Sequence, residues 1–507
     1  MAALTFAAAT TAAAIELLPP WLMKIIIDDV IGGNRPGILP WVIAGLLGAH
    51  VGKNVASSIR IRFNNTLEQR VIYDLRDQVF TALQRLSISY YENRSTGEIM
   101  NRVNNDVEHV ERIFIDGIES LLMSSLTLIG ISAILFSLNW KLALLSLLPI
   151  PVLVFSASYF TGRVHKFYRG VRESSADLNA YLQDAISGIR ETMGFSREAY
   201  ERERFNQRSK TYSDSNLRVM TLWSMYSPSM IVVGSLGSVI ILWYGTGEVL
   251  AGALSVGELV AFVSYLALFY VPINQIHSVN HMLQHALAAS ERVFEILDTT
   301  PDVADRPGVV RPAGKLRGDV AARHVSFHYR PDIPVLKDVN FEVQAGTRIA
   351  LVGPSGAGKS TLIKLLMRFY DVKDGAVMLD GRDLRDLPLA YVREQIGLVQ
   401  QEPFLFNGTV KENIAYGDLT AGQARLEEVA QAARAHEFIV ELPEKYDTWI
   451  GERGVKLSVG QKQRISIARV LLKDPPIIIF DEATSNIDTE TEVKIREALE
   501  ELTRNRT

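Results

Sequence analysis

Six apolar segments, each long enough to cross a lipid bilayer, constrain this chain more than any other feature of its sequence. A helix needs about 20 residues to span the roughly 30 Å of hydrocarbon. Because lipid offers no hydrogen-bond partner to an open backbone, the segments predict an all-α polytopic membrane domain over residues 1–297. The segments are residues 2–27, 38–59, 118–138, 142–162, 219–244 and 257–276.

Two short interruptions shape the predicted membrane domain. Pro19 and Pro20 fall inside the first segment and predict a kinked helix, because proline removes a helical hydrogen bond. Only Asn139, Trp140 and Lys141 separate the third segment from the fourth. So short a connection predicts a tight helical hairpin.

Two long charged stretches, residues 60–116 and 163–218, lie between the spans. Their apolar residues recur at helical spacing, so we expect the membrane helices to continue far into water and return. Both stretches are rich in Lys and Arg, whereas the connections on the opposite side hold only Arg35 and Lys141. The positive-inside rule therefore places both stretches and both termini in the cytoplasm, for a multi-pass protein of the cell's inner or plasma membrane.

The remainder of the chain has the pattern of a soluble α/β domain. Residues 298–318 are rich in Pro, Gly and charge and predict a linker. The α/β domain is expected over residues 319–507. The chain has no cysteine, which excludes disulfides and thiolate chemistry, and its net charge of -4 gives no footprint for nucleic acid.

The α/β region contains a complete phosphate-binding loop motif, formed by Gly353, Pro354, Ser355, Gly356, Ala357, Gly358, Lys359 and Ser360. An apolar run at residues 348–352 predicts a strand before the motif, and the run from Thr361 to Phe369 predicts a helix after it. The glycines let successive N–H groups point at phosphate oxygens. Lys359 would add positive charge at the β- and γ-phosphates, and the Ser360 hydroxyl would complete the shell of Mg²⁺. The motif, together with Thr361 directly after it, therefore predicts nucleotide binding.

A second apolar run, residues 477–480, ends in two acids, Asp481 and Glu482. A buried parallel strand explains the run, but it does not explain two carboxylates at the strand end where α/β proteins meet their ligands. Asp481 is predicted to hold Mg²⁺, directly or through water, and Glu482 to act as general base on the attacking water. The plainer alternative is a pair of ordinary helix-capping acids.

Just upstream of that run, residues 457–461 read Leu-Ser-Val-Gly-Gln and resemble the signature motif of ATP-binding cassette (ABC) proteins. The resemblance implies that Ser458, Gly460 and Gln461 contact ATP. Val459 departs from the family, which usually has glycine there. A valine costs free energy if that position needs a positive φ, so we expect a working but slower site.

Other landmarks of the family follow in the expected order. The resemblance implies that Tyr329 stacks on adenine and that Gln401 touches Mg²⁺ and faces the membrane domain. Residues 451–454 resemble the cross-talk loop of exporters. Asp488 resembles the aspartate that reaches across a dimer of cassettes.

The membrane half also resembles that of ABC exporters. Residues 90–106 are similar to the first cytoplasmic coupling segment, and residues 187–205 to the region around the second. Six spans fused to one cassette imply a half-transporter, so two chains would sandwich two ATP molecules, with Mg²⁺, between their cassettes. The resemblance implies export driven by ATP hydrolysis and performed by alternating access.

The partners follow from the same resemblance. The other subunit would be a second half-transporter in the bilayer, with a homodimer favoured and a heterodimer open. The spans carry few fixed charges, which favours amphipathic or lipid-like substrates, with drugs, lipids and peptides all open. A rival interpretation is an ATP-gated channel, or a regulatory half of a heterodimer with little turnover. Glu482 argues against it, because a site that does not hydrolyse ATP needs no base.

We also expect the sequence to be an excerpt of a longer natural chain, cut at both ends. The first apolar helix starts at Met1 without a polar lead-in, and the family's switch histidine should follow one more strand after Thr507. The nucleotide-binding domain of residues 319–507 is therefore expected to be incomplete at its C-terminal end. Intact-mass measurement of the purified protein would test this expectation.

Overall fold

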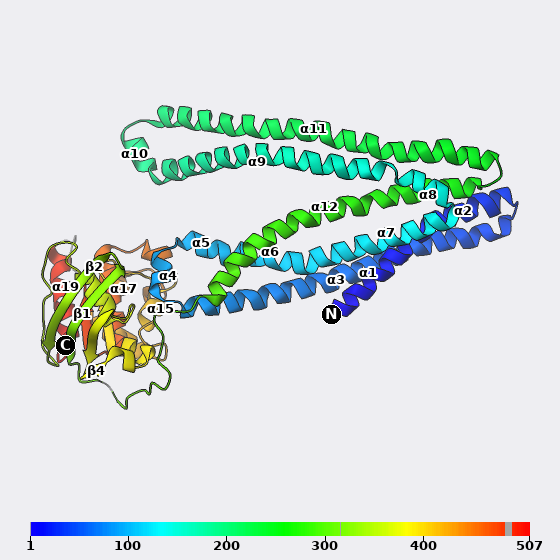
Figure 1. The fold of residues 1–507 in the computed structure, drawn as a ribbon. Helices are drawn as coiled ribbons and strands as arrows, with labels where there is room; N and C mark the ends of the chain where they lie inside the picture. The colour runs from blue at the N-terminus through cyan, green and yellow to red at the C-terminus, as the bar shows by residue number, and fades with distance from the viewer. Residues whose placement is uncertain (1, 315, 482–488) are drawn as a thin grey trace. The chain divides into compact units, whose positions relative to one another are not determined.

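The computed structural model describes residues 2–314, 316–481 and 489–507. The chain forms two compact units (Figure 1). The first comprises Met1–Val79 and Asn101–Glu295, and the second comprises Phe80–Met100 and Ile296–Thr507. The stretch Phe80–Met100 therefore belongs to the same compact unit as the C-terminal part of the chain.

The first unit is built from helices, several of them long, and some continue into the second unit. In chain order they are α1 (Ala2–Glu16), α2 (Leu18–Ile25), η1 (Ile26–Gly32), η2 (Pro36–Ile38), α3 (Leu39–Arg85), α5 (Thr96–Asn101), η3 (Arg102–Asp106), α6 (Val107–Arg112), η4 (Ile113–Gly117), α7 (Ile118–Leu138), α8 (Trp140–Leu147), α9 (Pro149–Ser187), α10 (Ile189–Gly194), α11 (Glu198–Leu250) and α12 (Val256–Asp298). Among these, η1, η3 and η4 are π-helical, a local widening that the apolar pattern does not predict.

Within the described residues, all six predicted spans are helical. Judged by length and composition, four helical segments can cross a membrane, namely Ala3–Gly32, Pro36–Arg85, Thr96–Leu138 and Glu198–Leu250. The other two predicted spans contain shorter apolar helices, Trp140–Leu153 and Val256–Pro272. The predicted all-α membrane fold is confirmed.

The two predicted interruptions are present. α1 ends at Glu16 and α2 begins at Leu18, so the first span is interrupted at Leu17, directly before the helical turn that contains Pro19 and Pro20. Asn139 separates α7 from α8, and its side-chain oxygen accepts a hydrogen bond from the backbone N–H of Leu142 at 3.1 Å. This cap starts the return helix and explains why so short a connection suffices.

The helices α9 and α11 lie side by side as one long hairpin, and α10 closes its end (Figure 1). Tyr181 of α9 is buried, and its hydroxyl donates to the backbone carbonyl of Glu201 at 2.8 Å. The guanidinium of Arg208 lies 4.6 Å from the centre of the same ring. These contacts fasten the two helices near α10, in the part predicted to lie in water.

Two ion pairs, each with one buried partner, join η3 to α12 within the first unit. The buried carboxylate of Asp106 accepts hydrogen bonds from Nε and Nη2 of Arg292, at 2.7 and 2.6 Å. One turn away, the buried guanidinium of Arg102 donates to Glu295 at 2.7 Å. Because a buried charge without its partner is costly, these pairs fix the register between the two helices.

We expect Asp106→Ala to lower the free energy of unfolding by about 1–3 kcal/mol, because it removes a two-bond partner of Arg292. Thermal unfolding in detergent micelles measures the effect. Arg169→Gln is the matched control, since the Arg169–Glu173 pair on α9 is 80% and 69% exposed and should contribute less than about 0.5 kcal/mol. Equal melting temperatures for the two variants would contradict the role given to Asp106.

The second unit contains two sheets among its described residues. The antiparallel sheet has the order β2-β1-β3-β4, and the parallel sheet pairs β5 with β6. The strands are β1 (Val320–Arg330), β2 (Ile333–Val343), β3 (Asp374–Leu379), β4 (Arg382–Asp383), β5 (Ile396–Val399) and β6 (Ile477–Phe480). This confirms the predicted α/β character of the region.

Helices surround these sheets. They are α4 (Ile88–Glu92), α13 (Lys359–Leu366), η5 (Leu384–Asp386), α14 (Leu389–Gln395), α15 (Val410–Ala415), α16 (Gln423–Ala432), α17 (His436–Glu441), η6 (Lys445–Asp447), η7 (Glu452–Gly454), α18 (Val459–Lys473) and α19 (Thr489–Leu502). Leu362 and Leu365 of α13 share a core with Val325 and Phe327 of β1. The buried face of α18 lies in a second core with Val399. The motif-bearing helices are thus held by apolar packing.

The predicted strand at residues 348–352 is wrong in this structure, which assigns no strand there. Val352 is 88% exposed. A strand requires a neighbour for its ladder, and β6 is already paired with β5 on one side. On its other side, the N–H of Ile478 donates to the carbonyl of Thr507 at 2.8 Å. The segment before the phosphate loop therefore has no strand partner among the described residues.

Candidate nucleotide site

The phosphate-binding loop depends on two glycines with left-handed backbones. Gly356 has φ +82° and Gly358 has φ +90°, values that other residues rarely adopt. A Cβ added at Gly358 would lie 2.6 Å from Cδ2 of Leu336. Ser355 and Ala357 are exposed in the same loop. Conformation and space therefore both require glycine at position 358.

The helix α13 begins directly after the loop. The amino group of Lys359, its first residue, donates hydrogen bonds to the carbonyls of Gly353 and Pro354 at 2.8 and 3.0 Å. Ser360 is exposed in the first turn. A helix N-terminus that follows left-handed glycines presents backbone N–H groups to an anion, and the lysine adds positive charge. The loop therefore fits the phosphates of a nucleotide.

Tyr329, near the end of β1, lies beside the same helix. Its hydroxyl is 3.2 Å from the hydroxyl of Thr361. Its ring packs edge-to-face with Phe327 and Tyr370, with ring centres 5.0 and 5.3 Å apart. Tyr329 is nevertheless 45% exposed, so its ring is available to stack on a planar base.

Asp481 and Gln401 follow the ends of neighbouring parallel strands. Val399 of β5 pairs with Phe480 of β6, and the N–H of Asp481 donates to the carbonyl of Val399 at 3.0 Å. Gln401 comes two residues after Val399 and is exposed. A carboxylate, an amide oxygen and the Ser360 hydroxyl are all oxygen donors, which Mg²⁺ prefers. These three side chains therefore fit the predicted metal-binding set chemically.

The signature motif forms the start of α18. Ser458 is the N-cap, and Gln461 completes a capping box with it. The Gln461 N–H donates to the Ser458 hydroxyl at 3.2 Å, and the Ser458 N–H donates to the Gln461 amide oxygen at 2.9 Å. Val459 is the first helical residue and Gly460 is buried behind it. The expected strain at Val459 is therefore wrong, because a right-handed helical backbone accepts valine.

The structure brings the predicted residues together in three groups. Tyr329 lies beside Thr361, just after the phosphate loop. Asp481 and Gln401 follow the C-terminal ends of the neighbouring strands β6 and β5. Ser458 and Gln461 satisfy each other at the start of α18. Glu482 and Asp488, the predicted base and the predicted cross-dimer aspartate, lie outside the described residues.

Two polar residues that the sequence did not single out, the buried Asn413 and the half-buried Arg469, shape the segment after Gln401. Arg469 of α18 donates to the carbonyls of Asn413 and Phe404, at 2.9 and 3.1 Å. Asn413 accepts from the N–H of Phe406 at 2.8 Å and donates back to its carbonyl at 3.0 Å. Burial lowers the pKa of Arg469. Neither residue has a motif of its own, so no sequence signal could have found them.

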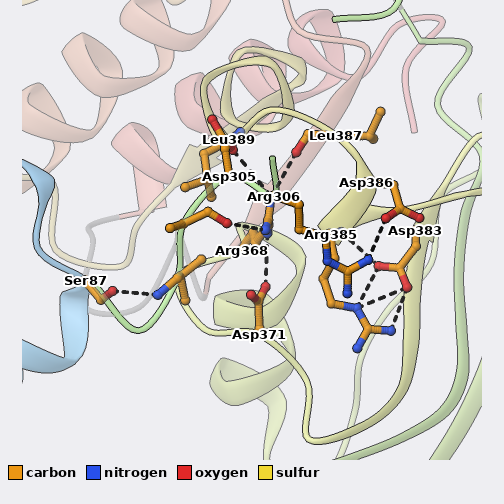
Figure 2. A network of polar contacts seen from close by, with 12 residues as sticks. Ser87, Asp305, Arg306, Arg368, Asp371, Asp383, Arg385, Asp386, Leu387 and Leu389 are labelled. Atoms are coloured by element: carbon orange, nitrogen blue, oxygen red, sulfur yellow. Dashed lines mark hydrogen bonds and ion pairs between the residues drawn. The ribbon is translucent and has the colours of Figure 1, made fainter. Parts of the chain in front are cut away.

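A second unpredicted arginine, Arg368, holds the predicted linker in place within the second unit (Figure 2). Its guanidinium is buried and donates to the carbonyls of Ala304 and Leu387, at 3.0 and 2.9 Å, and to Asp371 at 3.0 Å. Next to Ala304, the N–H of Val303 donates to the Ser87 hydroxyl at 2.9 Å. Arg368 thus holds the linker against the segment that follows the phosphate-loop helix, and the linker in turn bonds to the residue before α4.

We expect Arg368→Met to lower the free energy of unfolding by about 2–4 kcal/mol, because the carbonyls of Ala304 and Leu387 and the carboxylate of Asp371 lose their buried donor. Differential scanning calorimetry of the purified protein measures this loss. Arg306→Gln is the control, because the Arg306–Asp386 pair in the same network is 51% and 60% exposed and should contribute less than about 1 kcal/mol. A Met variant as stable as the control would show that the linker is held by other contacts.

A phosphate loop, a strand-end carboxylate and a capped signature turn, on one chain with membrane-long helices, define a P-loop ATPase domain fused to a polytopic helical domain. Two models of known protein families match the same two parts of the chain. The model described as "ABC transporter transmembrane region" matches residues 2–273, and the model described as "ABC transporter" matches residues 336–485.

Individual proteins resemble the chain over almost its whole length. It is 37% identical over 487 residues to the ATP-dependent lipid A-core flippase of Syntrophus aciditrophicus strain SB, across 96% of this chain and 81% of that protein. It is 37% identical over 507 residues to the ABC transporter ATP-binding protein YwjA of Bacillus subtilis strain 168, across 99% and 88%. A solved structure of a bacterial Atm1-family ABC exporter with ATP bound matches with a TM-score of 0.82 at 28% identity, across 99% of this chain and 89% of that one.

The chain therefore belongs to the ABC transporter family and has the exporter arrangement, in which a transmembrane region precedes an ATPase domain on the same chain. It is a membrane protein whose ATPase activity drives transport.

Proposed function

We propose that the protein exports an amphipathic or lipid-like substrate by alternating access, as a dimer of identical half-transporters with their ATPase domains in the cytoplasm. The observation that carries this proposal is the joining of a phosphate loop and a capped signature turn to helices that can cross a membrane. The lipid A-core flippase among the relatives supports a lipid-like substrate. The small number of charged residues in the apolar spans supports it independently.

The proposed chemistry assigns each group a separate task. Lys359 and the loop N–H groups bind the β- and γ-phosphates of ATP. Mg²⁺, held by Ser360, Gln401 and Asp481, would neutralise charge that develops on the phosphate oxygens. Glu482 would accept a proton from the attacking water.

The signature residues complete the proposed site from the other copy. Ser458, Gly460 and Gln461 at the start of α18 would contact the ATP bound by the partner's phosphate loop. The role proposed for Asp488 is also to reach across the dimer. A helix N-terminus with a polar cap is suited to a phosphate. The side chain of each of Ser458 and Gln461 accepts a hydrogen bond from the backbone N–H of the other, which preorganises the turn.

We expect Glu482→Gln to leave ATP binding intact, to reduce hydrolysis by about 10²–10⁴-fold and to accumulate a closed dimer, because the variant lacks the general base. Equilibrium nucleotide binding and phosphate release on the same reconstituted sample separate the two effects. Hydrolysis near the native rate would contradict the assignment of the base.

An exposed apolar tip supports the proposed dimer. Ile189 and Met193 of α10 are 44% and 62% exposed, and Phe195 just beyond it is 72% exposed. The second unit also exposes aromatic rings next to Gln401, with Phe404 at 50% and Phe406 at 42%. Exposed apolar surface of this kind marks an interaction site. We propose that α10 of one copy docks on these rings of the other copy.

The absence of cysteine from the sequence makes this docking directly testable. We expect the double variant Phe195→Cys, Phe404→Cys to form a disulfide-linked product of twice the chain mass under mild oxidation, because the two sites meet across the dimer. Each single variant is the control and should give no such product. A dimer by native mass spectrometry that never cross-links would contradict this docking.

The substrate class is tested by ATPase stimulation in nanodiscs with panels of lipids, cationic drugs and peptides. Stimulation by lipids or amphipathic compounds, together with their ATP-dependent movement between leaflets, supports the proposal. An ATP-dependent ion conductance without such movement would favour the gated-channel alternative.

A further inference from the structure

Within the second unit, the short helix α4 contacts the C-terminal part of the chain through the carboxylate of Glu92. One oxygen of this carboxylate accepts a hydrogen bond from the amino group of Lys364 at 2.7 Å. The other accepts from the hydroxyl of Tyr370 at 2.7 Å. Lys364 lies in α13, one turn after Ser360 of the phosphate loop. Glu92 therefore contacts the helix that is proposed to bind the phosphates.

Both partners of Glu92 also contact Tyr329. The amino group of Lys364 lies 5.5 Å from the centre of the Tyr329 ring, a distance at which a cation is attracted to an aromatic face. The Tyr370 ring meets the Tyr329 ring edge-to-face, with an interplanar angle of 86°. Tyr329 itself is tied to Thr361 of α13 by its hydroxyl. Its orientation thus depends on two neighbours that Glu92 holds.

The Glu92–Lys364 pair is charged near neutral pH. Burial alone would raise the pKa of Glu92, but the hydrogen bonds from Lys364 and Tyr370 outweigh it and lower that pKa. Burial alone would likewise lower the pKa of Lys364, but Glu92 and Tyr329 outweigh it and raise that pKa. Each group therefore stabilises the ionised form of the other.

We propose that Glu92 and Lys364 are positioning residues for Tyr329, through which docking of α4 sets the affinity of the site for ATP. The inference rests on the proposed stacking of adenine on Tyr329. With α4 in place, Glu92 orders Lys364 and Tyr370 against the Tyr329 ring. When α4 withdraws, Lys364 loses its counter-ion and becomes free to leave the ring, so the stacking surface is no longer preorganised.

This role predicts a change in ATP affinity with little change in the chemical step. Lys364→Met keeps the length of the side chain and removes its charge, and Glu92→Gln keeps an acceptor for Tyr370. For either variant in nanodiscs we expect the Kd and the KM for ATP to rise about two- to fivefold, the usual range for one exposed cation–π contact, while kcat stays near the native value. Lys337→Met, at an exposed lysine of β2, is the control and should change neither. An unchanged Kd in Lys364→Met would overturn the proposal.

A charge swap separates ring positioning from simple docking. The double variant Glu92→Lys, Lys364→Glu restores an ion pair between α4 and α13, but it places a carboxylate near the negative face of the Tyr329 ring. We expect its Kd for ATP to remain raised, whereas Lys364→Arg should keep the native value. Native affinity in the swapped protein would overturn the proposal, since any ion pair would then suffice.

Tyr329→Ala distinguishes this inference from the function on which it rests. Loss of a stacked base should raise the Kd for ATP at least about fivefold. If it does so while Lys364→Met has no effect, the positioning role fails and the adenine site stands. If Tyr329→Ala leaves the Kd unchanged, the adenine assignment itself fails.

Discussion

Backbone hydrogen bonding in lipid is the constraint on which the rest of this structure depends. A peptide group in hydrocarbon must find its partner within its own helix, so the spanning segments cannot end until they reach water. Here several continue well beyond that point. α3 has 47 residues and α11 has 53, which at 1.5 Å per residue makes them about 70 and 80 Å long. A bilayer accounts for less than half of that length, and the remainder forms rigid arms that carry α4 and α10 into water.

The end of the first arm is held at two points. Before α4, the Ser87 hydroxyl accepts a hydrogen bond from Val303 of the linker, and the linker is held in turn by the buried Arg368. At the last residue of α4, Glu92 bonds to Lys364 and Tyr370. While both contacts are formed, α4 is held against the ATPase unit, and this is why it groups with that unit although it lies among the membrane helices in sequence.

Features coded by local pattern could be predicted from the sequence, and features that depend on distant partners could not. The apolar runs predicted the long helices. The short connection at residues 139–141 predicted the hairpin, which Asn139 caps. The strand expected at residues 348–352 does not form, because a strand needs a neighbour to pair with. β6 is already hydrogen-bonded to β5 on one edge and to Thr507 on the other. The backbone strain expected at Val459 is absent, because the Ser458 cap places Val459 in the first turn of a right-handed helix. Lys364 is one lysine among many until folding places Glu92 beside it.

The size of the proposed effect limits what α4 can do through Tyr329. A two- to fivefold change in ATP affinity is small beside the roughly 10⁴-fold preference needed to carry a two-state protein from almost wholly one state to almost wholly the other. The Glu92–Lys364 contact can therefore bias the transporter but cannot switch it. In the proposed dimer, the larger share would come from ATP bound between two phosphate loops and two signature turns, where each nucleotide would contact both copies only in the closed state. In such an arrangement the α4 contact sets the ATP concentration at which closure begins, and the two copies together supply the free energy of closure.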